Sequence, residues 1–216
     1  MLEAKTQRRL FFAFVAFGSI LRVFQAWRFE TRAWIDEIWV VLDPAYRMLT
    51  GVGPVERDWT WQVRDWIPPS LVFIQFKVLN ALGVTAGPAV LAAIRIRSAL
   101  ATCVGLAAFA WMLGRRFGLR GSPWLAALVL FFIPEFMHFG CTADLSVLGL
   151  PPLLLGSALL FWNNSREASW LTRVGGALVV LSALIRFQFG IFPAVFLCGM
   201  LWHRQWRNAA ELTFTG

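Results

Sequence analysis

The stretch LAAIRIRSALATCVGLAAFAWML, residues 91–113, decides the fold. It is apolar apart from Arg95 and Arg97 near its start, and it exceeds the roughly 20 residues that a membrane-spanning helix needs. It ends in the basic segment GRRFGLR, residues 114–120. The whole chain of 216 residues is 58% hydrophobic, with a mean hydropathy of +0.63. This composition indicates an integral membrane protein.

The charge pattern bears on partners as well as on topology. The net charge is +8, but the basic residues lie between long apolar runs. Positive charge at the inner membrane face explains this pattern, so we expect no nucleic-acid partner. The cysteines are too scattered to predict a disulfide framework or a zinc site: Cys103, Cys141 and Cys198.

The N-terminus predicts the orientation. Three basic residues precede the first apolar span, Leu10–Ala26, and no small-x-small cleavage site follows it. We interpret this segment as an uncleaved signal anchor whose N-terminus is inside. Arg22, near the far end of the span, is expected to extend its head group to the interface. The segment Trp27–Trp66 is then outside.

Residues 67–83 leave two topologies open. The segment is apolar but short, and it opens with Pro68-Pro69, which a helix tolerates near its start. Its polar residues share one helical face, as in a helix lying along the interface. A flat helix puts the basic segment 114–120 inside, which the positive-inside tendency favours, whereas a crossing helix inverts everything that follows.

The flat alternative predicts an all-α integral membrane protein with about six transmembrane helices. One membrane domain covers residues 1–216, with a large first outer loop, 27–90, that carries interfacial helices. The last two spans are short, so they could be partial helices that meet at Arg186. The predicted spans are 10–26, 91–113, 123–140, 146–162, 174–185 and 187–202.

The segment Trp27–Trp66 concentrates chemistry. It holds seven of the 12 acidic residues and six of the 12 tryptophans. Within it, Asp36 and Glu37 follow the first span closely and are flanked by Trp and Ile. Adjacent like charges and partial desolvation both raise the pKa of a carboxyl group, which makes it a better base. The alternative is a pair of ordinary solvated charges.

Three arginines lie near the predicted outer membrane boundary: Arg95, Arg97 and Arg186. Ionisable groups at such depth are costly and usually have a partner. They could form structural ion pairs or reach to the interface, or they could bind the phosphate of a lipid, because guanidinium groups match phosphate oxygens. The outer tryptophans could anchor the loop at the interface or stack on a sugar. No metal-ligand spacing is present.

Several short motifs resemble the type C (GT-C) membrane glycosyltransferases, and most closely the Alg9/GPI-type mannosyltransferases. The sequence Trp34-Ile35-Asp36-Glu37 stands where that family has His-Pro-Asp-Glu. Its helix and Gly turn are similar to residues 43–53, and its Thr-Trp-Glu and Arg-Ser-x-x-x-Pro stretches are similar to Thr60-Trp61-Gln62 and residues 64–68. The arginine pair of residues 95–97 and the LIRFQ of residues 184–188 also resemble it.

The resemblance implies an enzyme that uses a polyprenyl- or dolichyl-phosphate sugar, with a mannose-like hexose favoured. Asp36 would take the proton from an acceptor hydroxyl, which attacks the anomeric carbon with inversion, and Glu37 would assist. The departing phosphate would be stabilised by Arg64, Arg95, Arg97 or Arg186. Trp61 would contact the substrate. The scheme implies no cofactor and no obligatory metal.

The family's enzymes are longer, so the chain resembles their N-terminal half, and the remaining spans or a partner subunit are expected partners. The other expected partners are a lipid-linked sugar donor, membrane lipid, and a glycan or lipid acceptor. A bacterial inner membrane is favoured, or the endoplasmic reticulum membrane in a eukaryote. Two alternatives remain open: a transporter or flippase for lipid-linked sugars, and a non-catalytic fragment or subunit.

Overall fold

A computed structural model describes residues 3–28, 37–53, 66–116, 123–133, 142, 145–162 and 170–202. Within these residues the chain forms helices and turns and no strand, so the predicted all-α class is confirmed. The elements are α1 Ala4–Arg28, η1 Glu37–Leu42, α2 Asp43–Thr50, α4 Ile67–Ala81, α5 Gly87–Arg116, α6 Pro123–Phe132, α8 Leu145–Trp162, α9 Trp170–Ile185, η2 Phe187–Gly190 and α10 Ile191–Trp202.

Two helices are long and apolar enough to cross a membrane, Ala4–Arg28 and Gly87–Arg115. Both begin before the predicted spans, which started at residues 10 and 91. Helix α5 has 30 residues, or about 45 Å at 1.5 Å per residue, and so exceeds the roughly 30 Å hydrocarbon layer. A helix of this length that stands upright in a membrane therefore extends beyond the hydrocarbon layer at one or both ends.

Four shorter apolar helices stand at the other predicted spans: Pro123–Phe132, Val147–Phe161, Trp170–Ile185 and Gln188–Gly199. Six apolar helices thus lie where six spans were expected, while the number that cross the membrane stays a prediction. Helix α6 ends at Phe132, and residues 134–140 of its predicted span lie outside the described residues.

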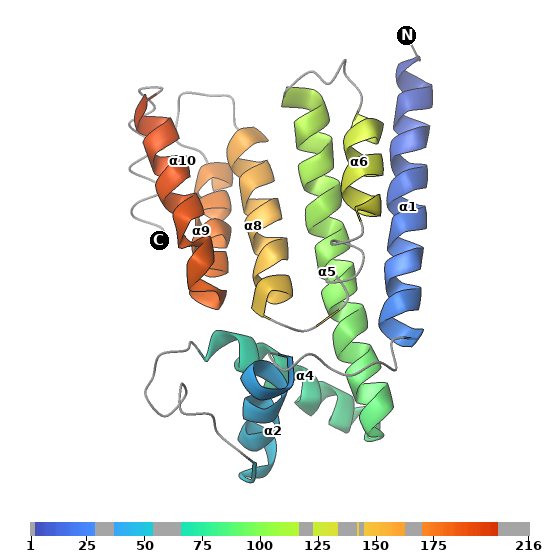
Figure 1. Cartoon of the computed structure of the whole chain (residues 1–216), viewed down its shortest axis with the longest axis vertical. Coiled ribbons are helices and arrows are strands. Elements are labelled where there is room, and N and C mark those ends of the chain that lie inside the picture. The colour runs from blue at the N-terminus through green and yellow to red at the C-terminus, as the bar shows by residue number, and fades with distance from the viewer. Residues whose placement is uncertain are drawn as a thin grey trace.

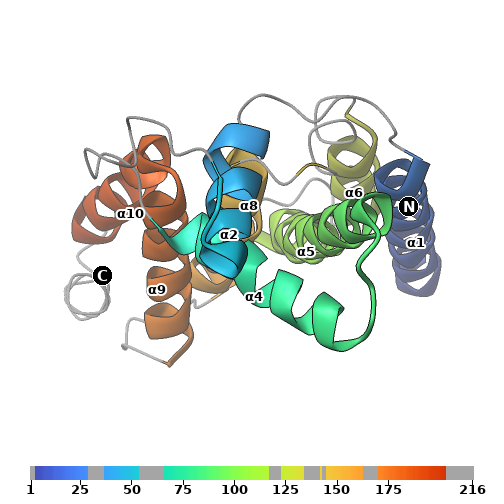
Figure 2. The same ribbon diagram turned by 90° about the horizontal axis from the view of Figure 1, so that it is seen from below.

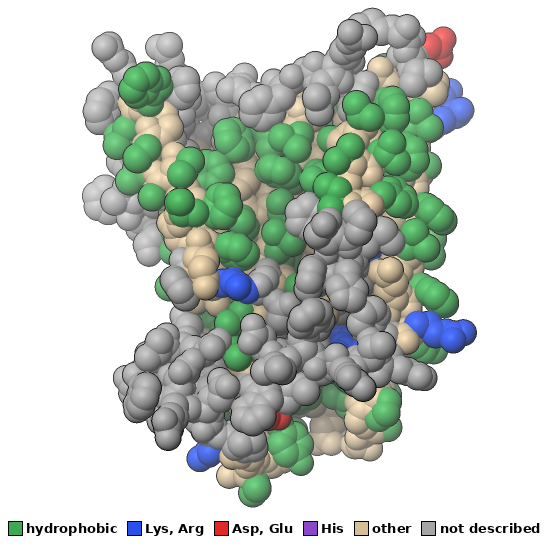
Figure 3. Space-filling view, viewed as in Figure 1, with side chains coloured by type: hydrophobic (Ala, Val, Ile, Leu, Met, Phe, Trp, Pro, Cys, Tyr) green, Lys and Arg blue, Asp and Glu red, His purple; other side chains and the backbone are tan. Residues whose placement is uncertain are grey.

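The apolar helices lie side by side and alternate in direction (Figure 1). Helix α8 packs between α5 and α9, while α1 packs against both α5 and α6. On the face seen in Figure 3, hydrophobic side chains cover much of the described bundle, and Lys and Arg lie towards its ends. We call the end where η1, α2 and α4 lie the capped end, and the end where α1 begins and α5 finishes the open end.

Helix α4 lies across the capped end rather than along the bundle (Figures 1 and 2). It packs mainly on α2 and η1, and it also contacts α5 and α9. Pro68 and Pro69 occupy its first turn, where a helix loses no hydrogen bond to proline. This orientation is the one that the interfacial alternative requires, although its depth in a membrane stays a prediction.

Close helix contact holds α8 to α9. A Cβ added at Gly156 would lie 2.7 Å from the carbonyl oxygen of Gly175, and one at Gly175 would lie 3.0 Å from that of Gly156. Small residues let backbones approach in this way, and van der Waals contact is a main attraction between helices in lipid. The glycine pair therefore fixes α9 and the residues that follow it.

The expectation for Arg22 was wrong. Its side chain is 0% exposed and lies between α1 and α6 instead of reaching the interface. Its guanidinium donates to the carbonyl oxygens of Gly18 at 3.3 Å and Leu130 at 3.5 Å. Its Cζ also lies 4.9 Å from the centroid of the Phe131 ring. A neighbouring helix that supplies a carbonyl and an aromatic face is a partner that single-span reasoning does not see.

Candidate functional site

A compact apolar cluster lies at the capped end. Its buried members come from η1, α2, α4, α5, α8 and α9: Val40, Val41, Ala45, Val72, Ile94, Leu148 and Ile185. Five of the seven are no more than 1% exposed. The cluster brings together segments that are far apart in the sequence, including the backbones next to Glu37, Arg95 and Arg186.

Arg95 and Arg97 stand in the third turn of α5, close to this cluster. Arg95 is 2% exposed and directly follows Ile94 of the cluster. Arg97 is half-buried, and its Nη2 donates to Ser98 Oγ at 3.5 Å. Side chains two positions apart leave a helix about 200° apart, so the two arginines face different neighbours. Whether either arginine binds a phosphate stays a prediction.

Arg186 marks the turn between α9 and η2, as predicted. Its backbone is extended, with φ −141° and ψ 111°, and its N–H donates to the Ser182 carbonyl oxygen at 3.0 Å. The side chain is half-buried, and its Nε donates to Gln188 Oε1 at 3.2 Å. Because the preceding residue, Ile185, is buried in the apolar cluster, the backbone of Arg186 is held at the capped end.

The other predicted site residues are less fully described. Glu37 begins η1, so its backbone lies at the capped end, but its side chain is not among those described. Asp36, Trp61 and Arg64 lie outside the described residues. The roles assigned to all these residues remain predictions.

Asp43 is a carboxylate of the capped end to which sequence analysis gave no role. It lies in the first turn of α2, where a negative charge is favoured by the helix dipole. Desolvation by burial raises the pKa of its carboxyl group above the usual value.

Helix α2 is capped at its C-terminal end by Gly51, whose φ of +75° suits glycine. The Gly51 N–H donates to the Arg47 carbonyl at 2.8 Å.

A cavity of about 300 Å³ opens between α2, α4 and the start of α5. Its walls are mainly apolar, with Tyr46, Asn80 and Thr85 as polar members. Sequence analysis missed it because its lining comes from η1, α2, α4, α5 and the turn between α4 and α5, whose arrangement only the fold sets. Among the described residues, no group of three or more His, Cys, Asp or Glu side chains could hold a metal ion.

Comparison with known proteins gives the family. The model of the Alg9-like mannosyltransferase family matches residues 11–215. The chain belongs to this family. The match covers both the capped end and the bundle of this Alg9-like chain, and it confirms the resemblance found in the short motifs.

A curated relative is the GPI mannosyltransferase 3 of Yarrowia lipolytica, which is 30% identical over 164 residues. The aligned region is 74% of the Alg9-like chain and 31% of that relative, so the chain spans about a third of the relative's length. No solved structure gives a significant match.

Proposed function

We propose that the chain is a glycosyltransferase, or the N-terminal part of one, that uses a sugar linked to a polyprenyl or dolichyl phosphate. A mannose-like hexose is transferred to an acceptor hydroxyl on the outer or luminal face, with inversion at the anomeric carbon. Membership of the Alg9-like mannosyltransferase family supports the reaction class. Its apolar helices support a membrane location.

The observation that carries the proposal is the apolar cluster at the capped end. It ties η1, which begins at Glu37, to the turn of α5 that holds Arg95 and to the end of α9 beside Arg186. A carboxylate base and a cationic phosphate site must be held near each other for inverting transfer from a lipid phosphate. The cluster supports such an arrangement by holding the three backbones at one end of the bundle.

In this mechanism Asp36 removes the proton of the acceptor hydroxyl while the oxygen attacks the anomeric carbon. The bond to the lipid phosphate breaks, and the electron pair leaves with that phosphate. Guanidinium groups stabilise the developing charge, with Arg95, Arg97 and Arg186 as the described candidates and Arg64 as a further one. Glu37 orients the acceptor, and Trp61 stacks on the sugar.

The test is Asp36→Asn, assayed in membranes of the source cells so that any further subunit is present. We expect transfer of radiolabel from polyprenyl-phosphate mannose to the glycolipid fraction to fall by about 10²–10⁴-fold. The matched control is Asp58→Asn, which removes another carboxylate of the same segment and should keep transfer. Normal transfer by Asp36→Asn, with equal protein in the membrane, would reject Asp36 as the base.

The alternatives make different predictions in the same membranes. A flippase would move lipid-linked sugar between leaflets of vesicles and would transfer none of it. A non-catalytic subunit would show no dependence on Asp36, but its removal would lower transfer by the remaining protein. Either result would replace the enzymatic proposal.

A further inference from the structure

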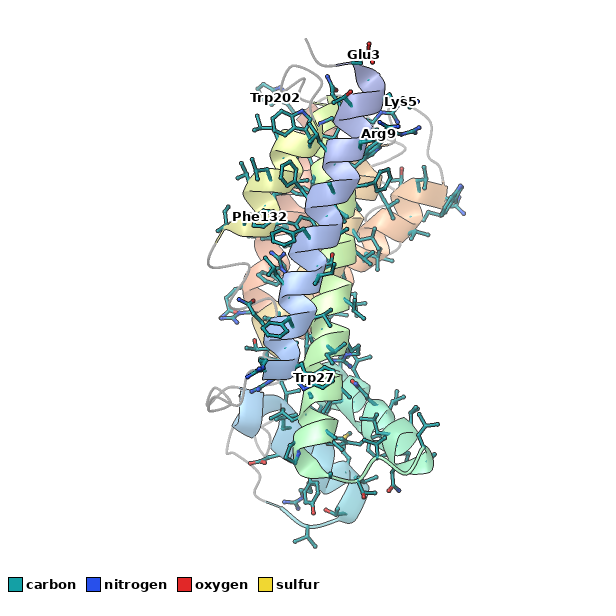
Figure 4. All side chains as sticks on the ribbon, turned by 90° about the vertical axis from the view of Figure 1, so that its right-hand side faces the viewer. Glu3, Lys5, Arg9, Trp27, Phe132 and Trp202 are labelled. Atoms are coloured by element: carbon teal, nitrogen blue, oxygen red, sulfur yellow. The ribbon has the colours of Figure 1, made fainter. Side chains whose placement is uncertain are left out.

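The open end has a basic cavity of its own. It measures about 460 Å³ and lies where α1 begins, α5 finishes and α6 begins. Three of its lining residues carry positive charge, and no described lining residue is acidic. The lining is Ala4, Lys5, Gln7, Arg8, Trp111, Arg115 and Pro123. Figure 4 shows Lys5 and Arg9 along this end of α1, with Glu3 at the tip of the helix.

An apolar groove adjoins this cavity. It measures about 730 Å³, runs between α1, α5 and α8, and shares Arg8 and Trp111 with the basic cavity. Alanines on two helices leave it hollow, and aromatic rings of α1 form one wall. Its other lining residues are Phe11, Phe12, Ala107, Ala108, Leu155, Ala158, Leu159 and Leu171. A cationic mouth above a hydrocarbon trough has the two-part chemistry of a phospholipid.

Trp111 holds the two arginines at the junction. The Cζ atoms of Arg8 and Arg115 each lie 6.0 Å from its ring. Phe11 meets the same indole edge to face at a centroid distance of 5.0 Å. One indole thus gathers two guanidinium groups from different helices, and guanidinium forks are suited to phosphate oxygens.

We propose that the open end binds one anionic phospholipid. Lys5, Arg8 and Arg115 contact the phosphate, and one acyl chain lies in the groove between α1 and α8. By the positive-inside tendency this site faces the inner leaflet, at the opposite end of the bundle from the proposed sugar chemistry. The site does not depend on the proposed function.

Charge and size favour lipid over protein as the occupant. A helix about 10 Å across fills roughly 400 Å³ per turn, so the groove accepts less than two turns of a further helix. A second copy of the chain would also bring the same cations to the mouth, and like charges repel. An anionic head group neutralises the mouth, and a flexible acyl chain follows the narrow trough.

The experiment uses the purified chain in phosphatidylcholine nanodiscs with and without phosphatidylglycerol, and native mass spectrometry counts retained lipid. We expect one phosphatidylglycerol to remain bound. Arg8→Gln with Arg115→Gln should weaken its binding roughly thirty-fold, since each cation near the head group contributes about tenfold or less. The control, Arg9→Gln with Arg173→Gln, removes two exposed cations outside both cavities and should change binding less than about threefold.

A second variant tests the groove without changing charge. Ala108→Phe places a ring in the trough and should displace the lipid while the unfolding temperature stays near that of the parent chain. The proposal is overturned if both double variants bind equally, or if Ala108→Phe retains full binding. It is also overturned if inorganic phosphate displaces the lipid at equal concentration, or if a second copy of the chain covers the groove.

Discussion

The capped end and the open end of the bundle are built in different ways. At the capped end, apolar side chains of the short helices and of α5, α8 and α9 form a buried cluster beside a cavity of about 300 Å³. At the open end, helix termini carry exposed cations around two larger cavities, of about 460 and 730 Å³. The difference indicates that packing fixes the backbones at the capped end, whereas the open end keeps charge and unfilled space at its surface.

The largest expected effect tests whether the two ends differ in packing, by truncating one large side chain at each end. Ile94→Ala removes a side chain that is 0% exposed from the cluster and should lower the free energy of unfolding by about 2–5 kcal/mol. Leu155→Ala, in the half-exposed wall of the groove, should cost well under half as much. Thermal unfolding in detergent measures both, and equal losses would mean that the two ends are packed alike.

Two glycine variants compare a position in close helix contact with an open position inside the bundle. Gly156→Ala should lower the unfolding free energy by about 1–3 kcal/mol, because its Cβ would meet the Gly175 carbonyl oxygen and side-chain atoms of Val179 and Leu178 on α9. Gly199→Ala adds the same methyl group to α10, where no atom lies within 4 Å, and should be neutral or stabilising by up to about 1 kcal/mol. Chemical denaturation of both variants checks this, and a reversed order would exclude the α8–α9 contact as a main support of α9.

The smallest effect is expected from Asp43 at the capped end. Its raised pKa means that the folded state favours the protonated form, so its contribution to stability is present at low pH and is lost as pH rises through the folded pKa. Asp43→Asn should therefore gain stability relative to the parent chain as pH rises through this pKa. A difference in unfolding temperature that is constant across the pH range would exclude this burial effect.

Predictions from the sequence were most accurate where a segment interacts mainly with lipid or water. The apolar helices, the break at Arg186 and the separate helix that begins at Pro68-Pro69 followed from local composition and proline chemistry. The sequence-based predictions failed where a second helix surrounds the side chain in question. Arg22 was expected at the interface, but a carbonyl and an aromatic ring of α6 make a buried position possible.

For the candidate site too, the sequence predicted some features and the structure was needed for others. Composition alone singled out Asp36, Glu37 and the arginines, because charged groups beside apolar spans are costly without a role or a partner. Spacing alone could not separate Arg95 from Arg97, whereas the structure buries the first and leaves the second half-buried beside Ser98.

The sequence by itself determined the membrane class, the helical segments and the family motifs, since these depend on hydropathy, proline and short runs of residues. Only the tertiary structure decided which helices share a cluster, where cavities remain and which arginines lie together on Trp111. Such features require residues distant in the chain to meet, and pair contacts across helices are not encoded in the order of residues along any one of them.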